Sequence, residues 1–251
     1  MTTQPVLAVE HLGLQIGGAR IMDDVTLAVK QGELLGVIGP NGAGKTTLFN
    51  LISGILTPTE GTVKLEGRDV TADPIHRRAR AGLGRTFQTS SLFPALSALE
   101  NVRLAAQLAL GKEISVIRFP RATDNATRIA RERLDEVGLS HHHDSQSRVL
   151  SHGDKRKLEI AMLLAAEPRV ILLDEPMAGV GSADVPGLVA VIRQVQRSGA
   201  TVLMVEHHMD VVLGLADRVA VMHHGQLLAC DTPAAVMADP AVQSAYLGET
   251  V

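Results

Sequence analysis

Hydrophobic and polar residues alternate through the first third of the chain, and this two-residue period predicts β-strands with one buried face. Residues 33–39, ELLGVIG, differ because the apolar run is continuous and ends in glycine, as is typical of a strand buried on both faces. Residues 61–70, GTVKLEGRDV, predict a further hairpin. The alternating positions are Leu12, Leu14 and Ile16 in one run and Val25, Leu27 and Val29 in the next.

A helical period replaces the alternation directly after the glycine-rich residues 39–46, and again from about residue 90 to residue 166. Within the second stretch, Ser97 and Glu100 fit a capping box, and Ser151 is placed to cap the last helix. The apolar positions are Leu48, Leu51, Ile52 and Ile55 in the first helix, and Ala126, Ile129, Ala130, Leu134 and Val137 in a later one that Gly138 closes.

Strands and helices alternate again after residue 166. Residues 169–175, RVILLDE, and 201–207, TVLMVEH, are strand-like, a helix is expected between them, and a hairpin is expected around Gly225. This alternation predicts an α/β fold with a parallel-sheet core and helices on both of its faces. The expected division of a single domain, residues 1–251, is a core of 1–88 and 167–251 and an inserted helical subdomain of 89–166.

Composition narrows the range of functions. Of the 251 residues, 45% are hydrophobic and 20% are charged, so a packed core is expected. Lysine and arginine number 24 against 27 acidic residues, and a net charge of −3 gives no general attraction to nucleic acid. The single cysteine, Cys230, fits a reducing compartment. No apolar run reaches the roughly 20 residues of a membrane span, so any work at a membrane is expected to go through a partner.

The strongest motif is GPNGAGKT, residues 39–46, which matches G-x-x-x-x-G-K-[ST] and lies between a predicted strand and a predicted helix. Glycines allow backbone N–H groups to curl around phosphate oxygens, and the helix N-terminus adds the positive end of its dipole. Lys45 is expected to contact the β- and γ-phosphates, and the Thr46 hydroxyl is expected to hold Mg²⁺. The expected nucleotide-binding residues of this loop are Gly39, Asn41, Gly42, Gly44, Lys45, Thr46 and Thr47.

Acidic and histidine side chains follow two of the predicted strands, at the edge where ligands bind in open α/β sheets. Asp174 suits a Mg²⁺ shell, directly or through water, and Glu175 suits the general base that activates the attacking water. His207 follows the second strand. On the residues alone, it either reaches the γ-phosphate or the attacking water, or is a structural histidine with its hydrogen bonds satisfied.

Five motifs in this order resemble the ATP-binding subunit of ABC transporters: GPNGAGKTT, RTFQ, LSHGD, ILLDEP and VEH. The resemblance runs from about residue 6 to the end of the chain. It implies a P-loop NTPase (RecA-like) core with an antiparallel β subdomain and an inserted helical subdomain. It also implies ATP and Mg²⁺ as cofactors.

In that family the LSHGD segment is the signature loop, and two ATP-binding subunits pair head to tail. The resemblance therefore implies that Ser151 and Gly153 cover the γ-phosphate held by the other subunit, although Ser151 can also serve as a helix cap. Gln88 would be the Q-loop residue that senses Mg²⁺ and water, and His207 the switch histidine. The helical subdomain, residues 89–166, would dock on two transmembrane permease subunits at the cytoplasmic face of the membrane.

Several positions depart from the family pattern. Ile16 stands where an aromatic residue usually stacks on adenine, so an apolar contact is expected there. His152 and Asp154 replace the second glycine and the glutamine of the signature loop. Gly181 stands where the loop after the acidic strand often carries aspartate, which affects a contact between paired subunits but not ATP binding.

The finer resemblance is to the larger ATPase subunit of importers for branched-chain amino acids. It rests on the stretches GRTFQTSSLFPALSALENVRLAAQ, VEHHMDVV and DPAVQSAYLGE. Importers of urea and short-chain amides share much of this pattern and remain an alternative. Such importers use a second ATPase chain and a periplasmic solute-binding protein, an indirect partner of this chain. This chain would not touch the transported solute. A soluble ABC-type ATPase acting on ribosomes or DNA, or a regulator that binds nucleotide and hydrolyses little, is the remaining alternative.

Overall fold

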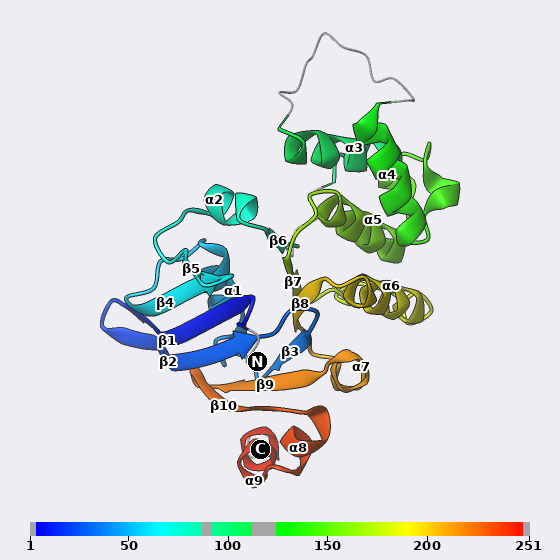
Figure 1. Ribbon diagram of the computed structural model, residues 1–251. Helices are drawn as coiled ribbons and strands as arrows, with labels where there is room; N and C mark the ends of the chain where they lie inside the picture. Colours follow the sequence, from blue (N-terminus) through cyan, green and yellow to red (C-terminus); the bar gives the residue numbers. More distant parts are fainter. Residues whose placement is uncertain (1–3, 87–91, 112–123, 248–251) are drawn as a thin grey trace. The chain divides into compact units, whose positions relative to one another are not determined.

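The computed structural model describes residues 4–86, 92–111 and 124–247 (Figure 1). Their contacts separate two compact units. The strand-rich unit contains Met1–Arg85, Arg169–Pro176 and Gln196–Val251. The helical unit contains Thr86–Pro168 and Met177–Val195. Within the described ranges, no helix combines the length and the apolar character needed to cross a membrane.

The strand-rich unit begins with an antiparallel sheet of four strands in the order β2-β1-β4-β5. The alternation seen in the sequence corresponds to β1 and β2, which pair from Leu7 with Val29 to Ile16 with Ala19. The hairpin predicted at residues 61–70 is confirmed as β4 and β5. The strands are β1 (Leu7–Ile16), β2 (Ala19–Val29), β4 (Glu60–Leu65) and β5 (Arg68–Asp69).

The second sheet has the order β10-β9-β3-β8-β7-β6, and the five strands from β9 to β6 run parallel. The antiparallel edge strand β10 forms the hairpin that was expected around Gly225. All residues of β3, β7 and β8 are buried, which explains why their sequences are continuously apolar. The strands are β3 (Leu34–Ile38), β6 (Leu83–Arg85), β7 (Val170–Asp174), β8 (Thr201–Val205), β9 (Arg218–His223) and β10 (Gln226–Asp231).

Helix α1 (Lys45–Ser53) follows the glycine-rich loop and packs its apolar face into the core shared by both sheets. The helix ends earlier than its apolar period suggests, because Gly54 adopts a left-handed conformation with φ 80°. Ile55 therefore lies outside the helix and is 41% exposed, so its expected place on the buried face was wrong. The other helices of this unit are α2 (Ile75–Arg80), α7 (Met209–Leu215), α8 (Pro233–Ala238) and α9 (Pro240–Leu247).

A buried arginine from α2 closes the C-terminal end of α1. Arg78 is 1% exposed, and its Nη1 donates to the carbonyls of Leu51 and Ile52 at 2.6 and 2.7 Å. Its Nε and Nη2 donate to the carbonyls of Asp73 and Thr71. The bonds to Leu51 and Ile52 satisfy carbonyls that a helix end leaves without intrahelical partners. Burial lowers the pKa of Arg78, while the charges of nearby aspartates oppose that shift.

The helical unit is built from capped helices with apolar inner faces. The capping box predicted at Ser97 and Glu100 is confirmed, and the Ser151 hydroxyl accepts from the N–H of Asp154 at 3.0 Å. Asp124 caps the helix between them. The helices are α3 (Ala98–Ala109), α4 (Asn125–Glu136), α5 (His152–Leu164) and most of α6 (Val185–Arg197), with the short turns η1 (Ser140–His142) and η2 (Ser147–Val149).

The two units differ from the expected division at residues 89–166, because Met177–Val195 groups with the helices by its contacts. Close packing against α5 accounts for this difference. A Cβ added to Gly153, at the start of α5, would lie 2.7 Å from the Cβ of Asp184, and one added to Gly187 would touch the side chain of Lys157.

Replacing Gly54 by alanine should destabilise the strand-rich unit. The left-handed backbone costs about 1 kcal/mol for a residue with a Cβ. The new Cβ would also meet Arg78 Nε at 2.8 Å, and disturbing the buried guanidinium adds about 1–3 kcal/mol. We expect a loss of roughly 2–4 kcal/mol in the free energy of unfolding, measured by urea denaturation.

Gly32→Ala is the matched control. Gly32 has φ +73° in the same unit, and a Cβ there would meet no atom within 4 Å. The control should lose only the backbone term of about 1 kcal/mol. Equal losses in the two variants would show that the approach of Arg78 is not what requires glycine at position 54.

Candidate active site

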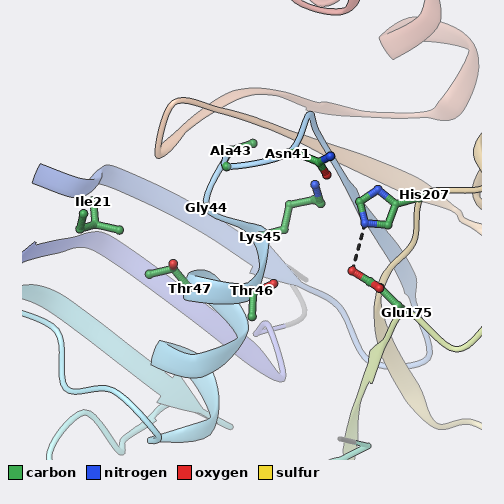
Figure 2. A pocket seen from close by; sticks show the side chains of 10 residues that line it. Ile21, Asn41, Ala43, Gly44, Lys45, Thr46, Thr47, Glu175 and His207 are labelled. Carbon is green, nitrogen blue, oxygen red and sulfur yellow. Dashed lines mark hydrogen bonds and ion pairs between the residues drawn. The ribbon is translucent and has the colours of Figure 1, made fainter. Parts of the chain in front are cut away.

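A pocket of about 200 Å³ opens in the strand-rich unit where the loop after β3 meets the ends of β7 and β8 (Figure 2). The loop supplies most of the lining, and each of the two strand ends supplies one titratable side chain. The lining residues are Ile21, Asn41, Gly42, Ala43, Gly44, Lys45, Thr46, Thr47, Glu175 and His207.

Glycine is required in the loop by close packing and by backbone conformation. At Gly39 φ is +153°, and a Cβ there would lie 2.2 Å from the carbonyl oxygen of Met222. At Gly44, which precedes α1, φ is +99°. Because glycine has no side chain to cap the helix, the first N–H groups of α1 remain available to an anion in the pocket. The loop therefore has the glycine conformations and the uncapped helix N-terminus that phosphate binding would need, as the sequence led us to expect.

Lys45 places a buried positive charge in this loop. The residue is 6% exposed, and its Nζ donates to the carbonyl oxygens of Gly39 at 2.5 Å and Pro40 at 2.9 Å. Burial lowers the pKa of the Lys45 ammonium, and the nearby charge of Glu175 works in the opposite direction. A phosphate group would supply the negative charge that carbonyl dipoles match only in part.

Glu175 and His207 meet directly across the pocket. The His207 Nε2 lies 3.0 Å from Glu175 Oε1, and both side chains are partly exposed (Figure 2). Glu175 has φ 46°, a conformation that is uncommon for a residue with a Cβ. Its N–H still donates to the carbonyl of Val205 at 2.9 Å, so the turn begins at the end of the strand ladder. This geometry is suited to a general base held by an imidazole.

Glu206 fixes the backbone that carries His207, a role that the sequence analysis missed although the residue stands in the VEH motif. The Glu206 carboxylate is 2% exposed, and its Oε2 accepts from the N–H groups of His207 at 2.8 Å and His208 at 3.2 Å. It also lies 2.9 Å from the Nδ1 of His208. The hydrogen bond with Glu206 raises the pKa of His208, and the small desolvation of that ring opposes it.

Asp174, the predicted Mg²⁺ ligand, lies at the end of β7 and is 1% exposed. It is not among the residues that line the pocket, and its Oδ2 accepts from Arg85 Nη2 at 2.8 Å. Thr46, a second predicted ligand, does line the pocket, and Gln88, the third, lies outside the described residues. Asp174 and Thr46 supply a carboxylate and a hydroxyl, the hard oxygen donors that Mg²⁺ prefers, so the donor chemistry fits this ion.

One predicted contact lies away from the pocket. Ile16, expected near adenine, ends β1 with 54% of its surface exposed and does not line the pocket. Ile21 in β2 lines it instead. No sequence motif marks Ile21, because its place depends on how β2 passes the loop. Gln88 lies outside the described residues.

Ser151 and Gly153 lie in the helical unit, at the start of α5. The Ser151 hydroxyl donates to Asp154 Oδ2 at 3.0 Å, and Lys157 donates to Asp154 Oδ1 at 3.1 Å. Burial pushes the pKa of Asp154 upward, but the hydrogen bonds from Lys157 and Ser151 outweigh it and lower the pKa. The departure from glutamine at this position therefore places a carboxylate in the first turn, beside the capping serine.

Comparison with known proteins agrees with this geometry. The family model described as ABC transporter matches residues 22–178, and one described as branched-chain amino acid ATP-binding cassette transporter matches residues 226–251. The chain is 38% identical to the high-affinity branched-chain amino acid transport ATP-binding protein LivG of Salmonella typhimurium. That match covers 98% of this chain and 99% of the relative.

Two further matches extend the comparison. The lipopolysaccharide export system ATP-binding protein LptB of Escherichia coli is 36% identical, over 97% of each chain. The crystal structure of the ADP conformation of MJ1267, an ATP-binding cassette of an ABC transporter, superimposes with a TM-score of 0.86. It is 30% identical, and the match covers 98% of this chain and 100% of that one.

The raised pKa of His208 predicts a pH-dependent contribution to stability. The folded state favours the protonated ring, so the contribution is complete below about pH 6.5 and is lost as the pH rises through the folded pKa. We therefore expect His208→Gln to reduce the free energy of unfolding more at about pH 6 than at about pH 8.5. Chemical denaturation across this pH range measures the difference.

The Glu206→Gln background is the control for this effect. Without the Glu206 carboxylate, the cost of His208→Gln should depend much less on pH in that range, because only the weaker effect of Asp210 is left to raise the pKa of His208. A pH dependence that persists undiminished in the Glu206→Gln protein would assign the effect to another partner of His208.

Proposed function

This chain belongs to the ABC transporter family of ATP-binding proteins, and from that premise we propose that it is the ATP-hydrolysing subunit of an importer for branched-chain amino acids. The observation that carries the hydrolytic role is the pocket in which Lys45, Glu175 and His207 meet beside the phosphate loop. The amino acid cargo is supported by the C-terminal family match and by the LivG relative.

In the proposed reaction the loop binds the phosphates of ATP through its backbone N–H groups, and Lys45 contacts the β- and γ-phosphates. Bound Mg²⁺, held by Thr46 and Asp174, would neutralise charge on the phosphate oxygens. Glu175 accepts a proton from the attacking water. His207 holds the Glu175 carboxylate in place through the 3.0 Å contact and would be available to the γ-phosphate when ATP is bound.

The helical unit supplies the second half of the proposed cycle. Ser151 and Gly153 would close over the γ-phosphate bound to another ATP-binding subunit, either a second kind of chain or a copy of this one. Gln88 would link the site to two transmembrane permease subunits, on which residues 89–166 dock at the cytoplasmic face of the membrane. ATP binding would close the pair and hydrolysis would reopen it, with a solute-binding protein acting on the far side.

Lipopolysaccharide and small amides such as urea are the two other candidate cargoes. The LptB relative is nearly as similar as LivG, which favours a lipopolysaccharide export role as the second candidate. The match of residues 226–251 to the branched-chain amino acid model argues against it. Import of urea or short-chain amides remains the nearest alternative within the importers.

Glu175→Gln should abolish turnover without loss of binding. Removing the base should lower the ATP hydrolysis rate roughly 10²–10⁴-fold, while the amide is nearly the same size and leaves the phosphate loop intact. Lys45→Ala, in contrast, should lose tight binding of ATP itself. Phosphate release and a nucleotide titration measure the two effects. Equal hydrolysis rates for wild type and Glu175→Gln would refute the assignment of the base.

Purification of the tagged chain from detergent-solubilised native membranes tests the transport role. We expect two multi-spanning subunits and a second ATP-binding subunit to copurify, because the importer assembles around a subunit pair. An amino-acid-binding protein recovered with them would support the proposed cargo, and one that binds urea or amides would redirect it. Recovery of lipopolysaccharide export components would select the second candidate, and ribosomal proteins without a membrane partner would exclude transport.

A further inference from the structure

A buried ion pair lies directly behind the catalytic edge of the sheet. Asp174 ends β7, immediately before Glu175, and its side chain is 1% exposed. Arg85 ends the neighbouring strand β6, with its side chain 8% exposed. The Arg85 Nη2 donates to Asp174 Oδ2 at 2.8 Å. A carboxylate at this depth is costly unless its charge is paired, so this contact matters to the whole site.

The guanidinium of Arg85 is fixed by α1 as well. Its Nη1 donates to the side-chain oxygen of Asn50 at 2.9 Å and to the Ser53 hydroxyl at 2.7 Å. The guanidinium carbon also lies over the ring of Phe49, 5.8 Å from its centroid. Arginine suits this position because its planar fork bonds in several fixed directions at once.

These bonds join the two elements that carry the proposed Mg²⁺ ligands. Thr46 is in the first turn of α1, and Asp174 is at the end of β7. One side chain from β6 is therefore bonded to both α1 and the Asp174 carboxylate. Arg85 is thus one of the contacts that join the helix to that carboxylate.

We propose that Arg85 is a positioning residue that serves as the built-in counter-ion of Asp174. It neutralises the charge of the buried carboxylate and orients it whether or not Mg²⁺ is bound. It also holds that carboxylate in a fixed position relative to α1. The part of this inference that concerns Mg²⁺ rests on the proposed function. The part that concerns the ion pair does not depend on the proposed function.

The pairing has a consequence for metal release. A guanidinium charge beside Asp174 repels a second cation at the same carboxylate. Arg85 therefore weakens the hold of Asp174 on Mg²⁺ while it keeps the carboxylate in place. An ATPase must release its products and metal in each turnover, and a permanent counter-ion prevents the buried charge from being left unpaired at that step.

The first test measures melting temperature in EDTA without nucleotide. Arg85→Met removes the guanidinium that is ion-paired with the buried Asp174, so the melting temperature should fall by roughly 6–20 °C. The double variant Arg85→Met with Asp174→Asn removes both charges and should recover at least about half of that loss. If Arg85→Met alone does not fold, a folded double variant supports the ion pair, and failure of both contradicts it.

Arg78→Met is the matched control. Arg78 is also buried, but its guanidinium donates to backbone carbonyls only: those of Leu51 and Ile52 near the C-terminal end of α1 and those of Thr71 and Asp73 before α2. This variant should also lower the melting temperature, but adding Asp174→Asn to it should lower that temperature further, because Arg85 then loses its partner. Recovery with Arg78→Met as well would show that Asp174→Asn stabilises the protein for a reason unrelated to Arg85.

The second test titrates Mg²⁺ against each variant in saturating ADP and follows the rise in melting temperature. In Arg85→Met the Mg²⁺ midpoint should fall roughly three- to tenfold, because the competing cation is gone. In Arg78→Met it should equal the wild-type midpoint. An unchanged or higher midpoint in Arg85→Met would overturn the claim that the Arg85 charge weakens Mg²⁺ binding, and a higher one would show that positioning of Asp174 is the larger effect. If ADP with Mg²⁺ raises the melting temperature of neither the wild type nor any variant, the proposed nucleotide function is wrong. The first test still shows whether Arg85 and Asp174 stabilise the protein as an ion pair.

Discussion

The parallel register of β3, β8 and β7 is the constraint on which the site depends. Val205 in β8 is the partner of Val37 on one side and of Asp174 on the other, so three strands reach the same level of the sheet. The chain leaves each strand at that level. The phosphate loop, Glu175 and His207 are therefore brought to one edge, as in other open parallel sheets.

Buried charges give this edge its electrostatic character, and each has polar or charged partners close by. Lys45 lies under its own loop with Glu175 nearby, Asp174 is bonded to Arg85, and Glu206 receives two backbone N–H groups and His208. Such pairs are expensive to form without good geometry. Their value here is that they hold reactive groups in fixed places before any substrate binds.

The helical unit carries a second candidate phosphate contact with its own chemistry. Asp154, held by Lys157 and by the Ser151 hydroxyl, gives α5 an acidic first turn. An acidic group is favourable for the helix itself at this position, yet it reduces the attraction for an anion. Asp154 in place of glutamine therefore stabilises the start of α5 but weakens its attraction for a phosphate group. The positive charge of Lys157 offsets part of that loss.

The sequence by itself determined the features that are written in local spacing. These include the phosphate loop, the acidic and histidine strand ends, the caps at Ser97 and Ser151, and the alternation that predicted a parallel sheet. Only the tertiary structure decided the pairing of Arg85 with Asp174, which are 89 residues apart. It also decided that Arg78 caps α1, that Ile21 lines the pocket, and that residues 177–195 group with the helices. The physical reason is that periodicity and motifs report on neighbours within a few positions. Contacts between distant residues depend on strand register and on how helices pack, which no local pattern encodes.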